Sequence, residues 1–171
     1  ESTVLVPNEF PKFLKWLPGV KNIAISEYRV KFTEIAFKNA DLIFCLDFNT
    51  ASRINHLEQK LTASKATKIL IDHHMEPDSF SYTYSDTSQP ATCQMIYKFI
   101  EALGEDSKID EDIAYCLYTG ILTDTGSFRF RNTTAETHKI IGNLIEKGAL
   151  PDVVASQVLD SNTPERIKLL G

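Results

Sequence analysis

The chain has 171 residues, of which 43% are hydrophobic and 24% charged, and its formal net charge is −5. These values are ordinary for one globular domain with a sizeable core, and they argue against a basic surface that tracks a long nucleic acid. They do not exclude a small anionic substrate, because bound divalent cations would reverse the local charge. No apolar run approaches the length of a membrane span, so we expect no membrane partner.

The first half of the chain predicts strands that alternate with helices. Short strands are expected at 3–6 and 23–25, and continuous apolar runs predict buried strands at 42–47 and 68–72. The helices expected between them span 9–17, 31–39 and 53–61. In the second of these, Phe32, Ile35 and Ala36 are expected on the apolar face. This alternation predicts an α/β fold in which a mostly parallel sheet is flanked by helices.

The second half of the chain is predicted to be mainly helical. Residues 76–88 are polar, and Phe80, Tyr82 and Tyr84 alternate as in an edge strand. The helices expected after them span 90–103, 110–122, 134–147, 152–159 and 165–170. Asp110 is expected to cap one of these helices and Gly148 to end another.

The three cysteines, Cys45, Cys93 and Cys116, are odd in number and far apart, and they have apolar neighbours. This pattern is typical of reduced core residues in a cytoplasmic protein rather than of a disulfide framework.

Polar side chains follow the two strongest predicted strands at the point where each strand ends. Asp47 ends the first run, and Asp72, His73 and His74 end the second. In parallel sheets, ligands bind just beyond the carboxyl ends of the strands. A mixed set of carboxylate and imidazole groups favours Mn over Mg, so these residues suggest a metal site. Asp124, which ends the predicted helix at 110–122, is a further candidate ligand.

Each of these signals also has a simpler explanation. An isolated Asp after a strand or a helix, such as Asp47 or Asp124, is most often a cap or turn residue. Ser127, Arg129 and Arg131 follow Asp124, and the arginines could hold a phosphate bidentately. The segment Phe-Arg-Phe-Arg could equally be a strand whose arginines are simply its exposed positions.

Three motifs together resemble the DHH phosphoesterase superfamily. They are Cys-Leu-Asp at 45–47, Ile-Asp-His-His at 71–74, and Tyr-Thr-Gly-Ile-Leu-Thr-Asp-Thr-Gly-Ser-Phe-Arg-Phe at 118–130. Within this superfamily the chain is similar to the small bacterial oligoribonucleases that also dephosphorylate 3'-phosphoadenosine 5'-phosphate, which are relatives of the RecJ exonuclease. The resemblance implies a DHH domain fold and a hydrolase that uses two metal ions, with Mn²⁺ preferred.

The resemblance also implies roles for individual residues. Asp47 resembles the carboxylate that bridges the two metals, and His73 and Asp124 resemble ligands of one of them. His74 matches the histidine that approaches the substrate phosphate, and Asp72 is expected to orient a histidine as part of the catalytic group. Ser127, Arg129 and Arg131 fall in a segment expected to contact substrate.

The substrate class implied is a short oligoribonucleotide, 3'-phosphoadenosine 5'-phosphate, or both. The sequence leaves open a cyclic or linear dinucleotide phosphodiesterase of the same superfamily, an inorganic pyrophosphatase, and a degenerate domain that binds a nucleotide without hydrolysing it. It also leaves open whether the protein is a monomer or a homodimer.

The family pattern includes two parts that residues 1–171 do not show. One is an amino-terminal histidine followed by an Asp-x-Asp pair, and nothing before Asp47 fits it. The other is a carboxyl-terminal substrate-binding domain. We therefore expect residues 1–160 to form a DHH domain without its amino-terminal motif, 161–171 to begin a linker, and this piece alone to be nearly inactive.

Overall fold

A computed structural model describes residues 2–159 of the chain. The helix expected at 165–170 and the linker expected at 161–171 lie outside the described residues. The strands are β1 (Leu5–Val6), β2 (Ala24–Ile25), β3 (Leu42–Leu46), β4 (Thr67–Asp72) and β5 (Tyr82–Ser85). The α-helices are α1 (Val30–Asn39), α2 (Glu58–Ala63), α3 (Thr92–Ala102), α4 (Glu111–Asp124), α5 (Ala135–Glu146) and α6 (Pro151–Val158). Short 3₁₀ helices are η1 (Lys12–Leu14), η2 (Val20–Asn22), η3 (Ala51–Leu57) and η4 (Asp106–Lys108).

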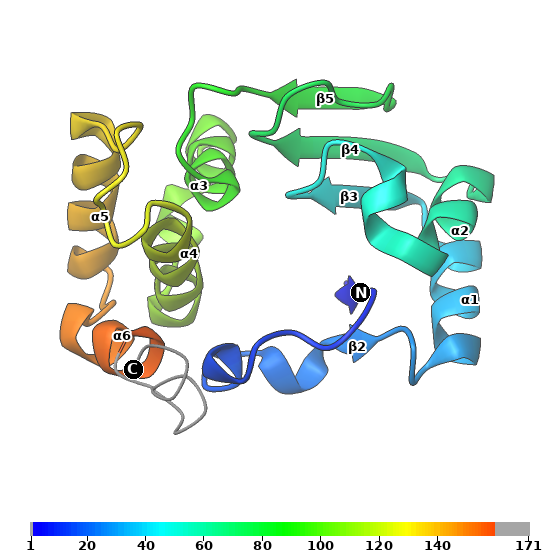
Figure 1. The fold of residues 1–171 in the computed structure, drawn as a ribbon, viewed down its shortest axis with the longest axis horizontal. Coiled ribbons are helices and arrows are strands. Elements are labelled where there is room, and N and C mark those ends of the chain that lie inside the picture. The colour runs from blue at the N-terminus through cyan, green and yellow to red at the C-terminus, as the bar shows by residue number, and fades with distance from the viewer. Residues whose placement is uncertain (1, 160–171) are drawn as a thin grey trace, which may run out of the picture.

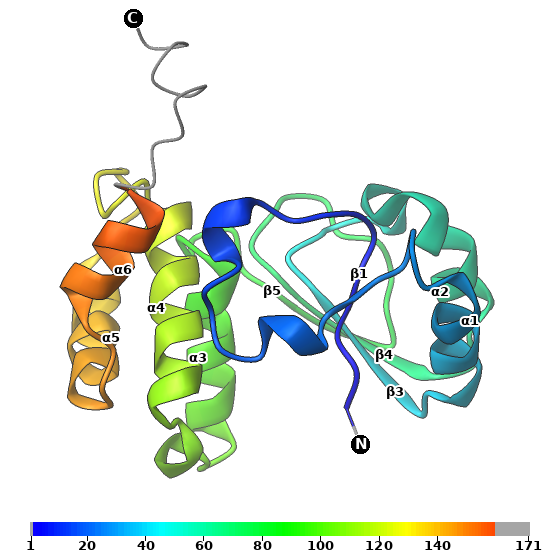
Figure 2. The ribbon, with the colours of Figure 1, turned by 90° about the horizontal axis from the view of Figure 1, so that it is seen from below.

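The strands form two parallel sheets, which confirms the predicted α/β class. One sheet has three strands in the order β3-β4-β5, and the other is the pair β1-β2. Helices α3 to α6 gather at one end of the molecule and α1 and α2 at the other, with the three-stranded sheet between them (Figures 1 and 2). The arrowheads of β3, β4 and β5 point toward α3 in Figure 1, so the carboxyl edge of this sheet faces the helical end.

Three helix boundaries have the capping residues that their sequence signals indicate. The carboxylate of Asp110 accepts a hydrogen bond from the backbone N–H of Ile113 and caps α4. Thr134 and Thr137 form a reciprocal capping box at the start of α5. Gly148 follows α5 with a φ of 110°, a conformation that glycine adopts without a steric penalty.

The apolar core is divided unequally between the two ends of the molecule. The helical end has a cluster of fourteen buried apolar residues drawn mainly from α4, α5 and α6. The cluster on the sheet contains three buried residues, Cys45, Leu61 and Leu70, with partly buried side chains packed around them. Burial raises the pKa of the Cys45 thiol to about 11, as expected for an inert core cysteine.

The apolar face predicted for α1 was wrong. Phe32 and Ile35 are exposed on this helix, whereas Thr33 is buried and Phe37 packs on the small core cluster. Thr33 and Phe37 are four residues apart and therefore share a helix face, which is the one that faces the sheet cluster. The apolar pattern thus located the helix but not its buried side.

Two of the predicted helices are also shorter or more irregular than expected. The segment 9–17 contains only the 3₁₀ helix η1, because Pro11 has no N–H to donate and restricts the residue before it. The segment 53–61 is broken at Asn55, whose φ of 52° and ψ of −125° lie outside the helical region. The residue that follows the break, His56, places its Nε2 2.7 Å from the Oγ of buried Ser26.

Within residues 2–159, no helix combines the length and the apolar character needed to cross a membrane.

Candidate metal centre

Asp47 lies immediately after β3, at the carboxyl edge of the three-stranded sheet. Its backbone N–H donates to the carbonyl of Ile71 at 3.1 Å, which extends the parallel pairing of β3 with β4 by one residue. Its φ of 63° is a left-handed conformation that Asp tolerates better than most residues. The chain turns here, and the Asp47 side chain remains half exposed.

His73 follows β4 and faces Asp47 across the edge of the sheet. Its Nδ1 lies 3.1 Å from the carbonyl oxygen of Gln89, and its Nε2 lies 3.7 Å from Asp47 Oδ1. A carbonyl can only accept, so the Nδ1 of His73 donates this hydrogen bond, and in the neutral ring the lone pair lies on Nε2. This tautomer is the one that metal-binding histidines usually adopt.

His74 is oriented by Asp72, the last residue of β4. Asp72 is fully buried, and both of its carboxylate oxygens are used by His74. Oδ1 lies 2.7 Å from the His74 Nδ1, and Oδ2 accepts from the His74 backbone N–H at 3.0 Å. The Nε2 of His74 is therefore its free nitrogen, and the rings of His73 and His74 meet edge to face at 4.7 Å.

These side chains form a compact group of donors. Asp47, His73 and His74 each offer one ligand atom, and the three atoms lie within 4.8 Å of one another. One carboxylate and two imidazoles suit a divalent transition metal such as Mn²⁺. The structure thus brings together three of the residues that the sequence singled out, with Asp72 behind one of them.

Asp124, the last residue of α4, lies beside this group without joining its 4.8 Å cluster. The pKa of the Asp124 carboxyl is raised from 3.8 to about 6, first by burial and then by the negative charge of Asp47, although His73 and His74 act to lower it. Helix α4, which ends at Asp124, packs closely against α3 because Gly120 has no side chain. A Cβ there would overlap the Sγ of Cys93 on α3.

The segment after Asp124 forms a left-handed turn. Gly126, Ser127 and Phe128 have φ values of 55°, 61° and 64°. Buried Thr125 holds this turn, because its hydroxyl accepts from the Phe128 N–H at 3.0 Å and its carbonyl accepts from the N–H groups of Arg129 and Phe130.

Arg129 and Arg131 are exposed on or beside this turn, and the strand interpretation of Phe-Arg-Phe-Arg was wrong because residues 126–130 turn instead of extending. The Arg129 Nε donates to the carbonyl of Gly126 at 2.7 Å, and its terminal nitrogens make no hydrogen bond to any of residues 2–159.

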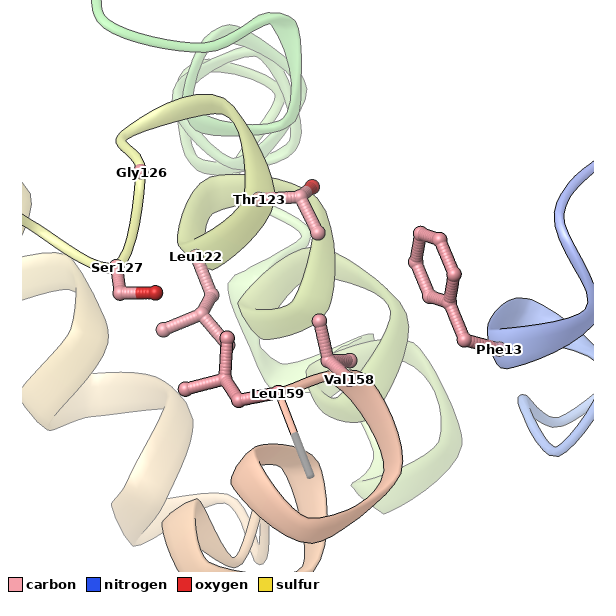
Figure 3. A pocket seen from close by; sticks show the side chains of 7 residues that line it. All are labelled: Phe13, Leu122, Thr123, Gly126, Ser127, Val158 and Leu159. Carbon is pink, nitrogen blue, oxygen red and sulfur yellow. The ribbon is translucent and has the colours of Figure 1, made fainter. Parts of the chain in front are cut away.

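Ser127 faces a separate hollow. This hollow has a volume of about 270 Å³ and is mostly apolar (Figure 3). Its lining residues are Phe13, Leu122, Thr123, Gly126, Ser127, Val158 and Leu159. Asp47 and the two histidines are not among them, so Ser127 lines a hollow to which these metal-ligand candidates do not contribute.

The sequence did not point to the loop between β5 and α3, which contributes to this site. Asp86 accepts from the N–H and Oγ of Ser88 and from the Nε2 of Gln89, and these hydrogen bonds, led by the one from the Ser88 hydroxyl, lower its pKa. Gln89 presents its carbonyl to His73, and Thr92 donates its hydroxyl to Asp47 Oδ1 at 2.7 Å. The only signal in the sequence was a run of turn-forming residues before a helix.

Comparison with known proteins gives consistent matches. The family described as "DHH family, N-terminal domain" matches residues 2–121 of this chain. The chain is 36% identical over 104 residues to the bifunctional oligoribonuclease and PAP phosphatase NrnA of Thermus thermophilus, an alignment that covers 60% of this chain and 31% of that protein. It is 33% identical over 112 residues to the protein of the same name from Bacillus subtilis, covering 64% and 34% of the two chains.

Among solved structures, an exopolyphosphatase-related protein from Bacteroides fragilis superposes with a TM-score of 0.96 at 36% identity, covering 99% of this chain and 50% of that one. The chain therefore spans about a third of the length of these two curated relatives and half of this solved structure.

Proposed function

Since this chain belongs to the DHH family, whose N-terminal domain it matches over residues 2–121, we propose that it is part of a metal-dependent phosphoesterase. The substrates we propose are short oligoribonucleotides and 3'-phosphoadenosine 5'-phosphate, in keeping with the names of its Thermus and Bacillus relatives. The observation that carries the proposal is the cluster of Asp47, His73 and His74, whose ligand atoms lie within 4.8 Å of one another.

The donor set fits a divalent metal. The Nε2 atoms of both histidines are free, because each Nδ1 is held by an acceptor, and the half-exposed Asp47 carboxylate can reach a cation at the mouth of the site. We propose that Asp47, His73 and Asp124 bind metal, with Mn²⁺ preferred. When bound, two such cations would lower the pKa of a water molecule and offset the charge of a phosphate.

The chain's own groups would prepare the site for this chemistry. Asp72 fixes the proton of His74 on Nδ1, and we propose that the free edge of His74 is directed at a phosphoryl oxygen. Gln89 fixes His73 in the same way through its backbone carbonyl. Arg129, held through Nε, keeps two terminal nitrogens for the remaining phosphate oxygens.

Further ligands would come from polypeptide outside residues 1–171. Two Mn²⁺ ions that prefer six ligands each need more donors than the three proposed ligands offer, even when water fills several positions. We therefore propose that residues 1–160 hold only part of the metal site.

The test is Asp47→Asn in the full-length protein, with Asp41→Asn as the matched control. Asp41 lies at the amino end of β3 and Asp47 at its carboxyl end, so the same substitution is made at both ends of one strand. We expect Asp47→Asn to lower Mn²⁺ content and to reduce turnover by roughly 100-fold or more, since even residues that only support a ligand cost 10- to 100-fold.

The measurement is hydrolysis of a dinucleotide and of 3'-phosphoadenosine 5'-phosphate, together with metal content and a melting curve. Near-normal turnover by Asp47→Asn would contradict the two-metal proposal. Hydrolysis of cyclic dinucleotides alone would reassign the substrate within the superfamily.

A further inference from the structure

Asp47 has a neighbour on the helical side of the site that binds it more closely than His73 does. The Thr92 hydroxyl donates to Asp47 Oδ1 at 2.7 Å, whereas His73 Nε2 lies 3.7 Å from the same oxygen. Thr92 is 3% exposed, and Asp47 precedes it by 45 residues in the sequence. Among residues 2–159, this is the one hydrogen bond that the Asp47 carboxylate receives from a side chain.

The Thr92 hydroxyl does not serve its own helix. Thr92 is the first residue of α3, and the cap position before it is Ala91, which has no side-chain cap bond. Threonines at helix starts commonly bond a nearby backbone N–H. Here the single hydroxyl proton is directed to a carboxylate on another element instead.

The donor is also rigid. Thr92 is branched at Cβ, which restricts its χ1 angle, and its side chain is enclosed by the protein. Asp47, by contrast, is half exposed and follows a turn with a positive φ. A fixed donor thus holds a carboxylate that would otherwise rotate in solvent.

We infer that Thr92 is a positioning residue for Asp47, and this inference rests on the proposed metal-binding role of Asp47. By occupying one lone pair of Oδ1, Thr92 fixes the carboxylate plane and leaves Oδ2 and the second lone pair of Oδ1 for metal. The amino end of α3, where Thr92 lies, adds the positive end of the helix dipole near this carboxylate.

The inference is tested with Thr92→Val and Thr92→Ser in the full-length protein. Valine keeps the shape and removes the hydroxyl, and serine keeps the hydroxyl and removes the methyl. The matched control is Thr119→Val on α4, because Thr119 is buried and its hydroxyl has no hydrogen-bond partner within residues 2–159. The readout is the dissociation constant of Mn²⁺, measured from the electron paramagnetic resonance signal of the free ion, alongside melting curves in EDTA.

We expect Thr92→Val to weaken Mn²⁺ binding by about 10- to 100-fold, the range seen when a group that orients a metal ligand is removed. For Thr92→Ser and Thr119→Val, the dissociation constant of Mn²⁺ should stay within roughly threefold of its value in the unmodified protein. Neither substitution removes the hydroxyl that donates to Asp47. Equal binding by Thr92→Val and the unmodified protein would overturn the inference and leave the proposed function intact. Equal losses in Thr92→Val and Thr92→Ser would also overturn it, because packing of the methyl would then explain both.

If the unmodified full-length protein does not bind Mn²⁺, the proposed function fails, and this inference fails with it.

Discussion

The helical end of this molecule buries many more apolar side chains than the sheet end. The helical end encloses fourteen buried apolar residues, whereas the cluster on the sheet encloses three. One face of β3 presents Leu42, Phe44 and Leu46 at 46%, 44% and 42% exposure. The alternate residue Cys45, which faces the other side, is fully buried. Within residues 2–159, therefore, one face of β3 is only partly covered, by contacts such as the one between Phe44 and Phe99 of α3.

This difference is informative because the candidate metal centre lies where the two ends meet. Asp47, His73 and His74 come from the sheet, and Thr92 and Asp124 come from the helices. The well-packed helices thus hold groups that contact or adjoin the candidate ligands at the edge of a less fully buried sheet. Substitutions at each end of the molecule, and then at the contacts between elements, test whether the two ends differ in this way.

The largest expected effect is in the helical core. Leu144→Ala removes a fully buried side chain from α5 and should lower the free energy of unfolding by roughly 2–5 kcal/mol. Leu42→Ala, on the exposed face of β3, should lower it by less than about 1 kcal/mol. Urea unfolding of both variants measures the difference. A comparable loss for Leu42→Ala would show that this face of β3 is covered by something beyond residues 2–159.

A smaller effect is expected where α3 and α4 touch. Gly120→Ala places a Cβ that overlaps the Cys93 Sγ and should destabilise the protein by roughly 1–3 kcal/mol, because a well-packed contact has to open. Gly142→Ala is the matched control. It lies in α5 with nothing within 4 Å of the new Cβ, so it should be neutral or stabilising by up to about 1 kcal/mol.

Adding Cys93→Ala to Gly120→Ala should recover part of the loss, since it removes the sulfur but leaves its Cβ 2.9 Å away. Thermal melts of the two single variants and the double variant measure this coupling. Independent, additive effects would show that the two helices accommodate the methyl without touching Cys93.

The smallest expected effect is the pH dependence of stability that comes from Asp124, the last residue of α4. Burial raises the pKa of Asp124 from 3.8 to about 6, so the folded protein binds the proton more tightly than the unfolded chain. The resulting stabilisation is fully present below pH 3.8 and is lost as the pH rises toward and through about 6. In EDTA, Asp124→Asn should remove this dependence and raise the stability at pH 7 by roughly 1 kcal/mol, after discounting for solvent near the carboxyl.

Urea unfolding at pH 4 and pH 7, with and without the substitution, measures the effect. A pH dependence that is unchanged in Asp124→Asn would assign it to another group.

The sequence could predict the elements of this fold better than their packing. The apolar runs at 42–47 and 68–72 located β3 and β4, because runs this short have the length of a strand and are shorter than most helices. The same runs predicted burial on both faces, which holds for Leu70 and Ile71 but not for Leu42 or Leu46. Burial depends on what packs against a strand, and periodicity within the strand does not contain that information.

In the candidate site too, the sequence could predict some residues and not others. The placement of Asp47, His73 and His74 at strand ends could be predicted, because parallel strands bring their carboxyl ends to one edge. Thr92 and Gln89 could not, since their hydrogen bonds to Asp47 and His73 depend on where α3 begins relative to the sheet. A Thr at a helix start suggests a cap in any sequence, and only the tertiary arrangement gives it another partner.

The loop from Asp86 to Thr92 has a consequence for how this protein can vary. It contacts His73 through Gln89 and Asp47 through Thr92, so three residue steps along one backbone span the distance between two metal-ligand candidates. The length of this loop sets the spacing of the two contacts. Adding or deleting one residue between Gln89 and Thr92 would displace one contact relative to the other. Surface loops usually tolerate changes in length, but this one should tolerate changes in residue type far better than changes in residue number.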